Sequence, residues 1–160
     1  MWMMRQSGRI AAISVSSEKG VSKTNVEGAL LVAEHGLRGD AHAGPWHRQV
    51  SFLAVESIAK MRDRGADVHP GSFAENITTE GIDFGQVEVG DQVVIGDALL
   101  EITQLGKECH ARCAIFDLVG DCVMPKEGVF AKVLRGAEIA VADRVEVSRP
   151  TAEAGEAGQS

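Results

Sequence analysis

Residues 106–113 hold the side chains best suited to chemistry in this sequence. They read Gly-Lys-Glu-Cys-His-Ala-Arg-Cys, and the first of the two cysteines is Cys109. Its neighbours include Lys107, His110 and Arg112, which only one glutamate opposes. Positive neighbours favour the thiolate, which is the nucleophilic and metal-binding form of cysteine. The alternative is a buried cysteine that packs as a small apolar residue, but the polar flanks disfavour it. The segment therefore predicts a functional thiolate at Cys109.

Zinc is a second possible use of these cysteines. The possible ligands are Cys109, His110, Cys113 and Cys122. Their spacing lacks the two close ligand pairs of a zinc ribbon or finger. In an extended segment, four steps of about 3.3 Å would place the first two cysteines about 13 Å apart, too far for a shared metal or a disulfide. Only a turn or a helix would bring them together. We therefore expect no structural zinc, and we expect Cys113 and Cys122 to be core residues.

A second polar cluster lies in residues 36–52, which read Gly-Leu-Arg-Gly-Asp-Ala-His-Ala-Gly-Pro-Trp-His-Arg-Gln-Val-Ser-Phe. Three glycines and a proline mark an irregular loop. Glycine lets the backbone approach a ligand closely, and arginines such as Arg38 and Arg48 hold phosphate or carboxylate in a planar fork. With His42, these residues predict an anion pocket. The alternative is a solvated loop in which Asp40 makes local turn hydrogen bonds.

Two shorter segments add polar groups. Residues 70–77 read Pro-Gly-Ser-Phe-Ala-Glu-Asn-Ile and lead from a turn into a predicted strand. Asn76 can donate and accept hydrogen bonds at once, as recognition of a heterocycle requires, or it can serve only as a turn residue. The Lys-Gly-Val-Ser-Lys stretch that ends at Lys23 adds two cations to a glycine-containing loop, for which a plain exposed loop is the alternative.

Short apolar runs predict strands as the elements that position these segments. The predicted strands cover residues 9–16, 29–33, 86–89, 93–95, 98–105, 139–141 and 145–147. In the first, Ala11, Ile13 and Val15 alternate onto one face. Turn residues predict two hairpins, one around Gly96-Asp97 and one around Ala142-Asp143.

Two helices are predicted among these strands. The first is capped by Ser51, turns Phe52 inward and ends near Gly65. The second covers residues 127–135 and ends at Gly136. Strands without regular helical crossovers argue against a doubly wound parallel sheet. The expected fold is therefore mainly β: a mostly antiparallel β-barrel with one or two packed α-helices.

Length and composition set outer limits on function. A chain of 160 residues with 44% hydrophobic residues suits one domain, and a formal net charge of −7 makes it a poor general binder of nucleic acid or anionic membrane. No apolar stretch approaches the roughly 20 residues that span a bilayer, and no signal peptide is visible. Three cysteines, an odd number, do not suit a secreted disulfide framework, so we expect a reducing cytoplasm. The small, polar residues after Pro150 predict a disordered tail.

Taken in order, the motifs resemble a known family. The series runs Lys-Gly-x-x-Lys, Gly-Leu-Arg-Gly-Asp-Ala-His-Ala-Gly, Arg-Gln-Val-Ser, Pro-Gly-Ser-Phe-Ala-Glu-Asn-Ile-Thr, Val-Gly-Asp, Leu-Glu-Ile-Thr-Gln, Cys109 and Gly-Val-Phe-Ala-Lys-Val-Leu-Arg-Gly. Each motif is weak alone, but the ordered set is specific. It resembles a MOSC domain, named for the C-terminal domain of molybdenum cofactor sulfurase, in a short stand-alone form. The resemblance covers residues 8–148 and leaves 149–160 as the tail.

The resemblance implies a strand-rich barrel and gives Cys109 the place of the family's signature cysteine. Family members are proposed to take sulfane sulfur from a pyridoxal phosphate-dependent cysteine desulfurase and pass it to a metal-sulfur centre. In related domains of larger oxidoreductases the matching cysteine ligates molybdenum, and some stand-alone relatives are linked to reduction of N-hydroxylated compounds. This sequence departs from many relatives in the Lys-Glu before Cys109, where they are richer in proline and arginine.

Three functional hypotheses follow. In the leading one, Cys109 carries sulfur as a persulfide whose anion Lys107 and Arg112 stabilise, and the partners are the desulfurase and a molybdenum-cofactor enzyme or biosynthesis protein. In the second, the chain binds the molybdenum cofactor with Cys109 as a soft ligand, for storage or as a small reductase. In the third, it is a non-catalytic interaction domain. The pocket for an anionic pterin or a docking partner is expected to be lined by Lys23, Arg38, His42, Arg48 and Asn76.

Overall fold

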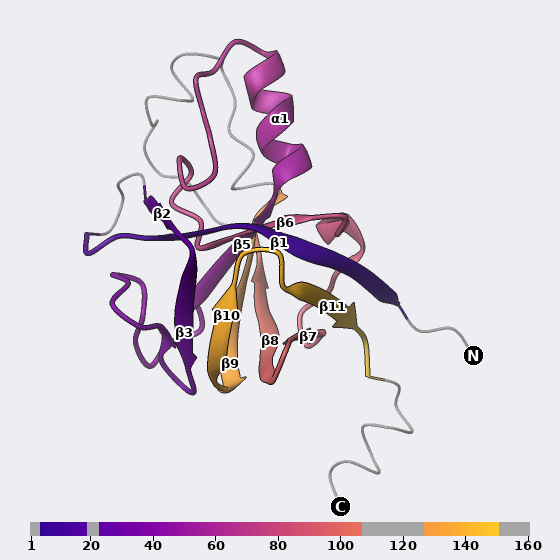
Figure 1. The fold of residues 1–160 in the computed structure, drawn as a ribbon. Coiled ribbons are helices and arrows are strands. Elements are labelled where there is room, and N and C mark those ends of the chain that lie inside the picture. Colours follow the sequence, from indigo (N-terminus) through magenta and orange to yellow (C-terminus); the bar gives the residue numbers. More distant parts are fainter. Residues whose placement is uncertain (1–3, 19–22, 107–126, 151–160) are drawn as a thin grey trace, which may run out of the picture.

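The structure is a computed structural model that describes residues 4–18, 23–106 and 127–150 (Figure 1). The first strands are β1 (Arg5–Val15), β2 (Thr24–Val26), β3 (Gly28–Val32), β4 (Gly36–Leu37) and β5 (Val50–Ala54). Helix α1 (Val55–Asp63), strand β6 (Ile77–Glu80) and the short 3-10 helix η1 (Phe84–Gln86) follow. The remaining strands are β7 (Gln92–Ile95), β8 (Ala98–Leu105), β9 (Val129–Arg135), β10 (Ala137–Ala140) and β11 (Arg144–Ser148).

The strands close into a mixed barrel. Around the ring the order is β1, β11, β7, β8, β9, β5 and β6, and β6 pairs again with β1. Only β5 and β6 run parallel in this ring, and the other pairs are antiparallel. Strand β2 pairs with the end of β1 and is not part of the ring. Strands β3, β4 and β10 form a separate three-stranded sheet (Figure 1). The predicted mainly β, mostly antiparallel barrel is therefore confirmed.

Side chains fill the barrel, as expected of a ring this narrow. The largest fully buried residues of this main core include Ile10, Ile13, Phe52, Ile77 and Leu100. A bulge in β1 between Ile10 and Ala12 puts Ile10 and Ile13 in the core. The predicted strict alternation, with Ala11, Ile13 and Val15 on one face, is therefore interrupted, because a bulge changes the alternation of side chains.

The predicted first helix starts later than its sequence pattern indicated. Ser51 and Phe52 lie in β5, and α1 begins at Val55 after Ala54, which makes no side-chain cap. Strand β5 is paired on both sides and all five of its residues are buried, so ladder hydrogen bonds outcompete a helix cap at Ser51. The predicted end is close to the observed one, since the Gly65 amide donates to Arg62 O just after the last turn. Within the described ranges, no helix is long and apolar enough to cross a membrane.

The predicted second helix is wrong. Residues 129–135 form β9, which pairs with β5 and β8. Val129, Phe130 and Val133 suit a strand as well as a helix, and a short apolar run cannot distinguish the two. The long-range partners β5 and β8 decide the outcome, because they satisfy the backbone groups of β9 from both sides.

One predicted hairpin is confirmed and one is wrong. Residues 93–95 and 98–105 pair across the Gly96-Asp97 turn. The Ala142-Asp143 turn instead joins two strands that do not pair: β10 pairs with β3, while β11 pairs with β1 and β7. The predicted strand at 86–89 is also absent from the described sheets, since Gln86 ends η1 and Val89 is exposed.

Candidate functional site

A buried ion pair joins two of the loops singled out in the sequence. Lys23 Nζ donates to Asp40 Oδ1 at 2.8 Å, and both side chains are fully buried. The amides of Ser16 and His42 each donate to the same carboxylate at 3.0 Å. Burial alone would raise the pKa of Asp40, but hydrogen bonds from His42, from Lys23 and from the two amides hold it well below its usual range. Asp40 is therefore an anion that fixes Lys23 and the start of the loop.

His42 continues this arrangement toward the surface. Its Nδ1 lies 3.1 Å from Lys23 Nζ and 3.7 Å from Asp40 Oδ2. Because the ammonium can only donate, Nδ1 is the acceptor of this hydrogen bond. The ring is parallel to that of Trp46, with centroids 6.5 Å apart, and Trp46 Nε1 donates to the His42 carbonyl at 2.7 Å. The structure therefore brings the predicted residues Lys23 and His42 into direct contact.

The other end of the same loop contacts the end of β8. Arg48 Nε donates to Gln104 Oε1 at 3.0 Å, and His47 Nε2 lies 2.8 Å from that same oxygen. The amide group of Gln104 in turn donates to Gly106 O at 2.8 Å. Arg48 is thus held beside Gly106, the last described residue before the segment that contains Cys109.

Aromatic rings support Arg48. Its guanidinium lies 5.2 Å from the centroid of Phe130 and 6.0 Å from that of Trp46, within cation–π range. Contacts thus continue from the buried ion pair to the end of β8. We use the name loop cluster for Lys23, Asp40, His42, Trp46, His47, Arg48 and Gln104.

Two predicted pocket residues make no described contact with the loop cluster side chains. The Arg38 side chain is exposed, and its backbone amide donates to Leu30 O at 2.9 Å. Asn76 is fully buried: its Oδ1 accepts from the Ser51 amide at 3.0 Å, and its Nδ2 donates to Ser14 O at 3.2 Å. Asn76 therefore connects neighbouring strands through their backbone. Its predicted role in binding a heterocycle stays a prediction, as does the role of Arg38.

Glu75 organises the turn before Asn76, and sequence reasoning missed it. Glu75 is fully buried, and its carboxylate accepts from Gly71 N at 2.8 Å, from Thr78 Oγ1 at 3.0 Å and from Phe73 N at 3.1 Å. Burial raises the pKa of Glu75 in spite of these donors. Its position just after a Pro-Gly turn was the available signal, because acidic side chains often accept hydrogen bonds from turn amides.

The predicted thiolate and its cations lie outside the described residues. This applies to Cys109, Lys107 and Arg112, and also to Cys113 and Cys122. The two ends of the intervening segment meet, because Gly106 N donates to Gly128 O at 2.6 Å. Among the described residues, no three His, Cys, Asp or Glu side chains are grouped so as to hold a metal ion. The expectation that the chain lacks structural zinc stays a prediction.

The pKa of Asp40 predicts how acid affects stability. Because the folded-state pKa is below its usual value of about 3.9, this carboxylate stabilises the fold above that pH. The contribution is lost as the pH falls through the folded-state value. We expect the difference in unfolding free energy between wild type and Asp40→Asn to be largest near neutral pH and to shrink progressively below about pH 4. Urea denaturation from pH 7 to pH 3 measures it. A constant difference over that range would contradict this account of Asp40.

The fold and part of the sequence match known proteins. A profile of the MOSC domain matches residues 39–146, more than half of the chain. The YiiM protein of Escherichia coli is 27% identical over 120 residues, which cover 69% of this chain and 54% of YiiM. The chain therefore spans about half the length of that curated relative.

Solved structures share the fold. The crystal structure of YuaD from Bacillus subtilis superposes with a TM-score of 0.77 at 15% identity, covering 94% of this chain and all of YuaD. YiiM from Geobacillus stearothermophilus gives a TM-score of 0.67 at 20% identity, over 92% of this chain and 78% of that one. At these identities the structures establish the fold alone, whereas the profile match establishes the relationship. This chain belongs to the MOSC domain family.

Proposed function

We propose that this domain carries sulfur for molybdenum cofactor metabolism, accepting it as a persulfide on Cys109 and delivering it to a metal-sulfur or molybdenum-pterin centre. Membership of the MOSC family supports a role related to the molybdenum cofactor. The observation that supports the finer proposal is the contact of Arg48 and His47 with Gln104, whose amide donates to Gly106, the last described residue before the segment with Cys109. Cys109 follows Gly106 by three residues in the sequence.

The proposed step exchanges one sulfur–sulfur bond for another. The Cys109 thiolate attacks the terminal sulfur of a persulfide on the donor desulfurase. A bond forms between Cys109 Sγ and that sulfur, while the bond to the donor cysteine breaks and its sulfur leaves as a thiolate. Delivery of this sulfur as sulfide needs two electrons, which a dithiol reductant supplies: the dithiol is oxidised to a disulfide, Cys109 returns to the thiol, and the extra sulfur leaves as hydrogen sulfide. Neighbouring cations such as Arg48, Lys107 and Arg112 favour the anionic forms of sulfur at both stages.

Stable binding of the molybdenum cofactor is the second candidate. It is favoured by the guanidinium of Arg48, since within the described residues only its Nε makes a hydrogen bond while the Nη groups remain available. The guanidinium of Arg48 suits the anionic part of such a cofactor, because a guanidinium binds phosphate through two parallel hydrogen bonds, and Arg38 and His42 are the further residues proposed to contact it. When bound, the cofactor would supply a redox-active metal. In this candidate Cys109 would be the soft ligand to the metal, because a thiolate is a soft donor.

The proposed setting follows from the chemistry. A free thiolate that cycles through a persulfide requires a reducing compartment such as the cytoplasm. The proposed partners are a pyridoxal phosphate-dependent cysteine desulfurase and a molybdenum-cofactor enzyme or biosynthesis protein. A purely structural interaction domain is the remaining alternative, in which Cys109→Ser leaves partner binding unchanged.

Intact-mass spectrometry under anaerobic conditions tests the proposal. The protein is incubated with a pyridoxal phosphate-dependent cysteine desulfurase and cysteine, and Cys109→Ser is compared with wild type. We expect a gain of one sulfur atom in wild type, removed by dithiothreitol and absent from Cys109→Ser. The matched controls Cys113→Ser and Cys122→Ser are expected to keep the gain. A gain that persists in Cys109→Ser would overturn the assignment.

Native mass spectrometry of protein purified anaerobically from cells that make the cofactor distinguishes stable cofactor binding from sulfur transfer. A cofactor-sized adduct in native mass spectra, lost in Cys109→Ser, would favour stable binding over sulfur transfer. If wild type shows the bare chain mass in both experiments, Cys109 has neither role.

A further inference from the structure

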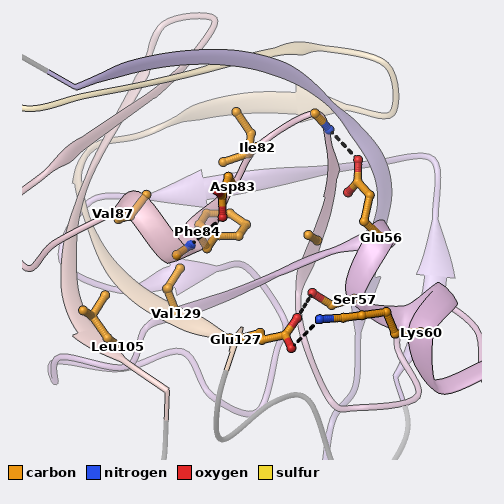
Figure 2. Close-up of a pocket in the computed structure, with 14 residues that line it drawn as sticks. Glu56, Ser57, Lys60, Ile82, Asp83, Phe84, Val87, Leu105, Glu127 and Val129 are labelled. Atoms are coloured by element: carbon orange, nitrogen blue, oxygen red, sulfur yellow. Dashed lines mark hydrogen bonds and ion pairs between the residues drawn. The ribbon is translucent and has the colours of Figure 1, made fainter.

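A cavity lies beside helix α1 (Figure 2), and no side chain of the loop cluster is among its described lining residues. Its volume is about 830 Å³, within the range of about 300–1,000 Å³ typical of small-molecule sites. It is bounded by the first turn of α1, by the connection from β6 to β7, and by the end of β8 and the start of β9. The described lining residues that decide what the cavity can bind are Glu56, Lys60, Phe84, Leu105, Glu127 and Val129.

The floor of this cavity is apolar. Ile82, Phe84, Val87 and Val129 all line it while each keeps less than a tenth of its surface exposed. Leu105 stands at its wall and is 49% exposed, one of the few large apolar side chains on the surface of the described part. Binding of an apolar ligand in an open cavity with such walls is favourable, because the ligand displaces water from apolar surface.

The rim is acidic. Three carboxylates line it, from Glu56, Asp83 and Glu127. The one ammonium among the described lining residues is that of Lys60. That ammonium is already paired, since Lys60 Nζ donates to Glu127 Oε2 at 2.7 Å, and Ser57 Oγ donates to the other oxygen at 2.5 Å (Figure 2). The described side chains around the cavity therefore favour a cationic ligand over an anionic one.

Glu56 offers the acceptor for such a cation. Its Oε2 accepts from Gly81 N at 3.0 Å, which holds the carboxylate against the cavity wall (Figure 2). Its Oε1 has no hydrogen-bond partner among the residues that the structure describes. By contrast, both oxygens of Asp83 accept local hydrogen bonds, from Gly85 N at 2.9 Å and from Gln86 Nε2 at 3.2 Å.

We propose that this cavity binds a small organic cation with an apolar or aromatic body. The body packs on the floor around Phe84 and against Leu105, and the protonated amine or amidine donates to Glu56 Oε1. Apolar burial supplies the driving force, and the acidic rim supplies the selectivity for charge. The proposal uses neither Cys109 nor the loop cluster, so it stands or fails independently of the sulfur-carrier role.

Three probes of matched size test it on the full chain: phenethylammonium, phenethyl alcohol and 3-phenylpropionate. Two-dimensional NMR follows the amides of Gly81, Gly85 and Gly128 during titration. We expect the cation to bind most tightly and the anion most weakly, with dissociation constants that differ by about tenfold or more. Added salt is expected to reduce the difference in affinity between the cation and the alcohol.

Variants separate charge from packing. Glu56→Gln keeps an acceptor for the Gly81 amide. We expect it to raise the dissociation constant of the cation by about threefold to fivefold and to leave that of the alcohol unchanged. Glu138→Gln, an exposed glutamate on β10 outside this cavity, is the matched control and is expected to change neither. Leu105→Ala is expected to weaken the binding of all three probes by a similar factor.

Two results would overturn the proposal. One is the absence of shifts at the cavity amides up to the solubility limit of the probes. The other is a set of affinities that ignore ligand charge, or that respond equally to Glu56→Gln and Glu138→Gln.

Discussion

Lys23→Met is expected to lower the free energy of unfolding by about 3–5 kcal/mol, because it leaves the buried Asp40 carboxylate without its charged partner. Both side chains of the pair are fully buried, so water cannot replace the lost ammonium. Two backbone amides still donate to Asp40, but they do not neutralise its charge. His42 also loses its contact with Lys23 Nζ, so the start of the loop cluster is expected to lose order.

A half-exposed ion pair provides the control for Lys23. Lys132 Nζ lies 3.8 Å from Glu101 Oε1, with side chains 38% and 36% exposed. Lys132→Met is therefore expected to cost less than about 1 kcal/mol. Urea denaturation at pH 7 compares the two variants, and Lys23→Met combined with Asp40→Asn is expected to recover part of the loss. Equal costs for the two lysines would contradict a buried, unscreened pair.

Gly71→Ala is the second substitution with a large expected effect. Gly71 has a φ of +97°, and a Cβ there would lie 2.6 Å from Lys23 O and 3.0 Å from Ser14 Oγ. The left-handed conformation alone costs a side chain about 1–2 kcal/mol. The clash with the Lys23 carbonyl adds about 1–3 kcal/mol more, because backbone on both sides must shift. We expect a total loss near 2–5 kcal/mol, with displacement of Lys23, which directly precedes β2.

Gly90→Ala isolates the conformational part of that cost. Gly90 has nearly the same φ, +98°, but nothing lies within 4 Å of a Cβ placed there. We expect this variant to lose only about 1–2 kcal/mol. Thermal and urea unfolding of both variants measure the difference. If the two substitutions cost the same, close packing of Gly71 against Lys23 does not contribute to stability.

The Gly71 and Lys23 predictions concern one structural unit. Lys23 N donates to Gly71 O at 2.9 Å, and Gly71 N donates to the buried carboxylate of Glu75 at 2.8 Å. The turn before β6 thus supports the lysine that holds Asp40. A substitution that distorts the turn is therefore expected to displace side chains of the loop cluster as well. The two stability experiments thus also test how the proposed site is held in place.

Much of the barrel could be predicted from local sequence. Alternation and the Gly96-Asp97 turn predicted the β7–β8 hairpin, because a two-residue turn and its flanking strands are set by neighbours in the chain. The absence of regular helical crossovers predicted a barrel over a doubly wound sheet. The ordered motifs predicted the family, which the match over residues 39–146 then established.

Errors arose where distant partners decide the conformation. Residues 129–135 carry an apolar pattern that a helix or a strand could bury, and pairing with β5 and β8 made them a strand. Ser51 has a good capping side chain, yet it lies in a central strand whose backbone is bonded on both sides. The last two strands flank a tight turn but pair with β3, β1 and β7, because closing the ring satisfies more backbone groups than a lone hairpin would.

The sequence by itself determined the chemistry that is available: a cysteine among cations, a loop rich in glycine, histidine and arginine, and the family to which they belong. Only the tertiary structure decided which of these groups meet. It paired Lys23 with Asp40, placed Arg48 on Gln104 at the end of β8, and directed Asn76 to the backbone of neighbouring strands. The physical reason is that a side chain's type fixes what it can donate or accept, whereas its partners and its solvation depend on elements far away in the chain.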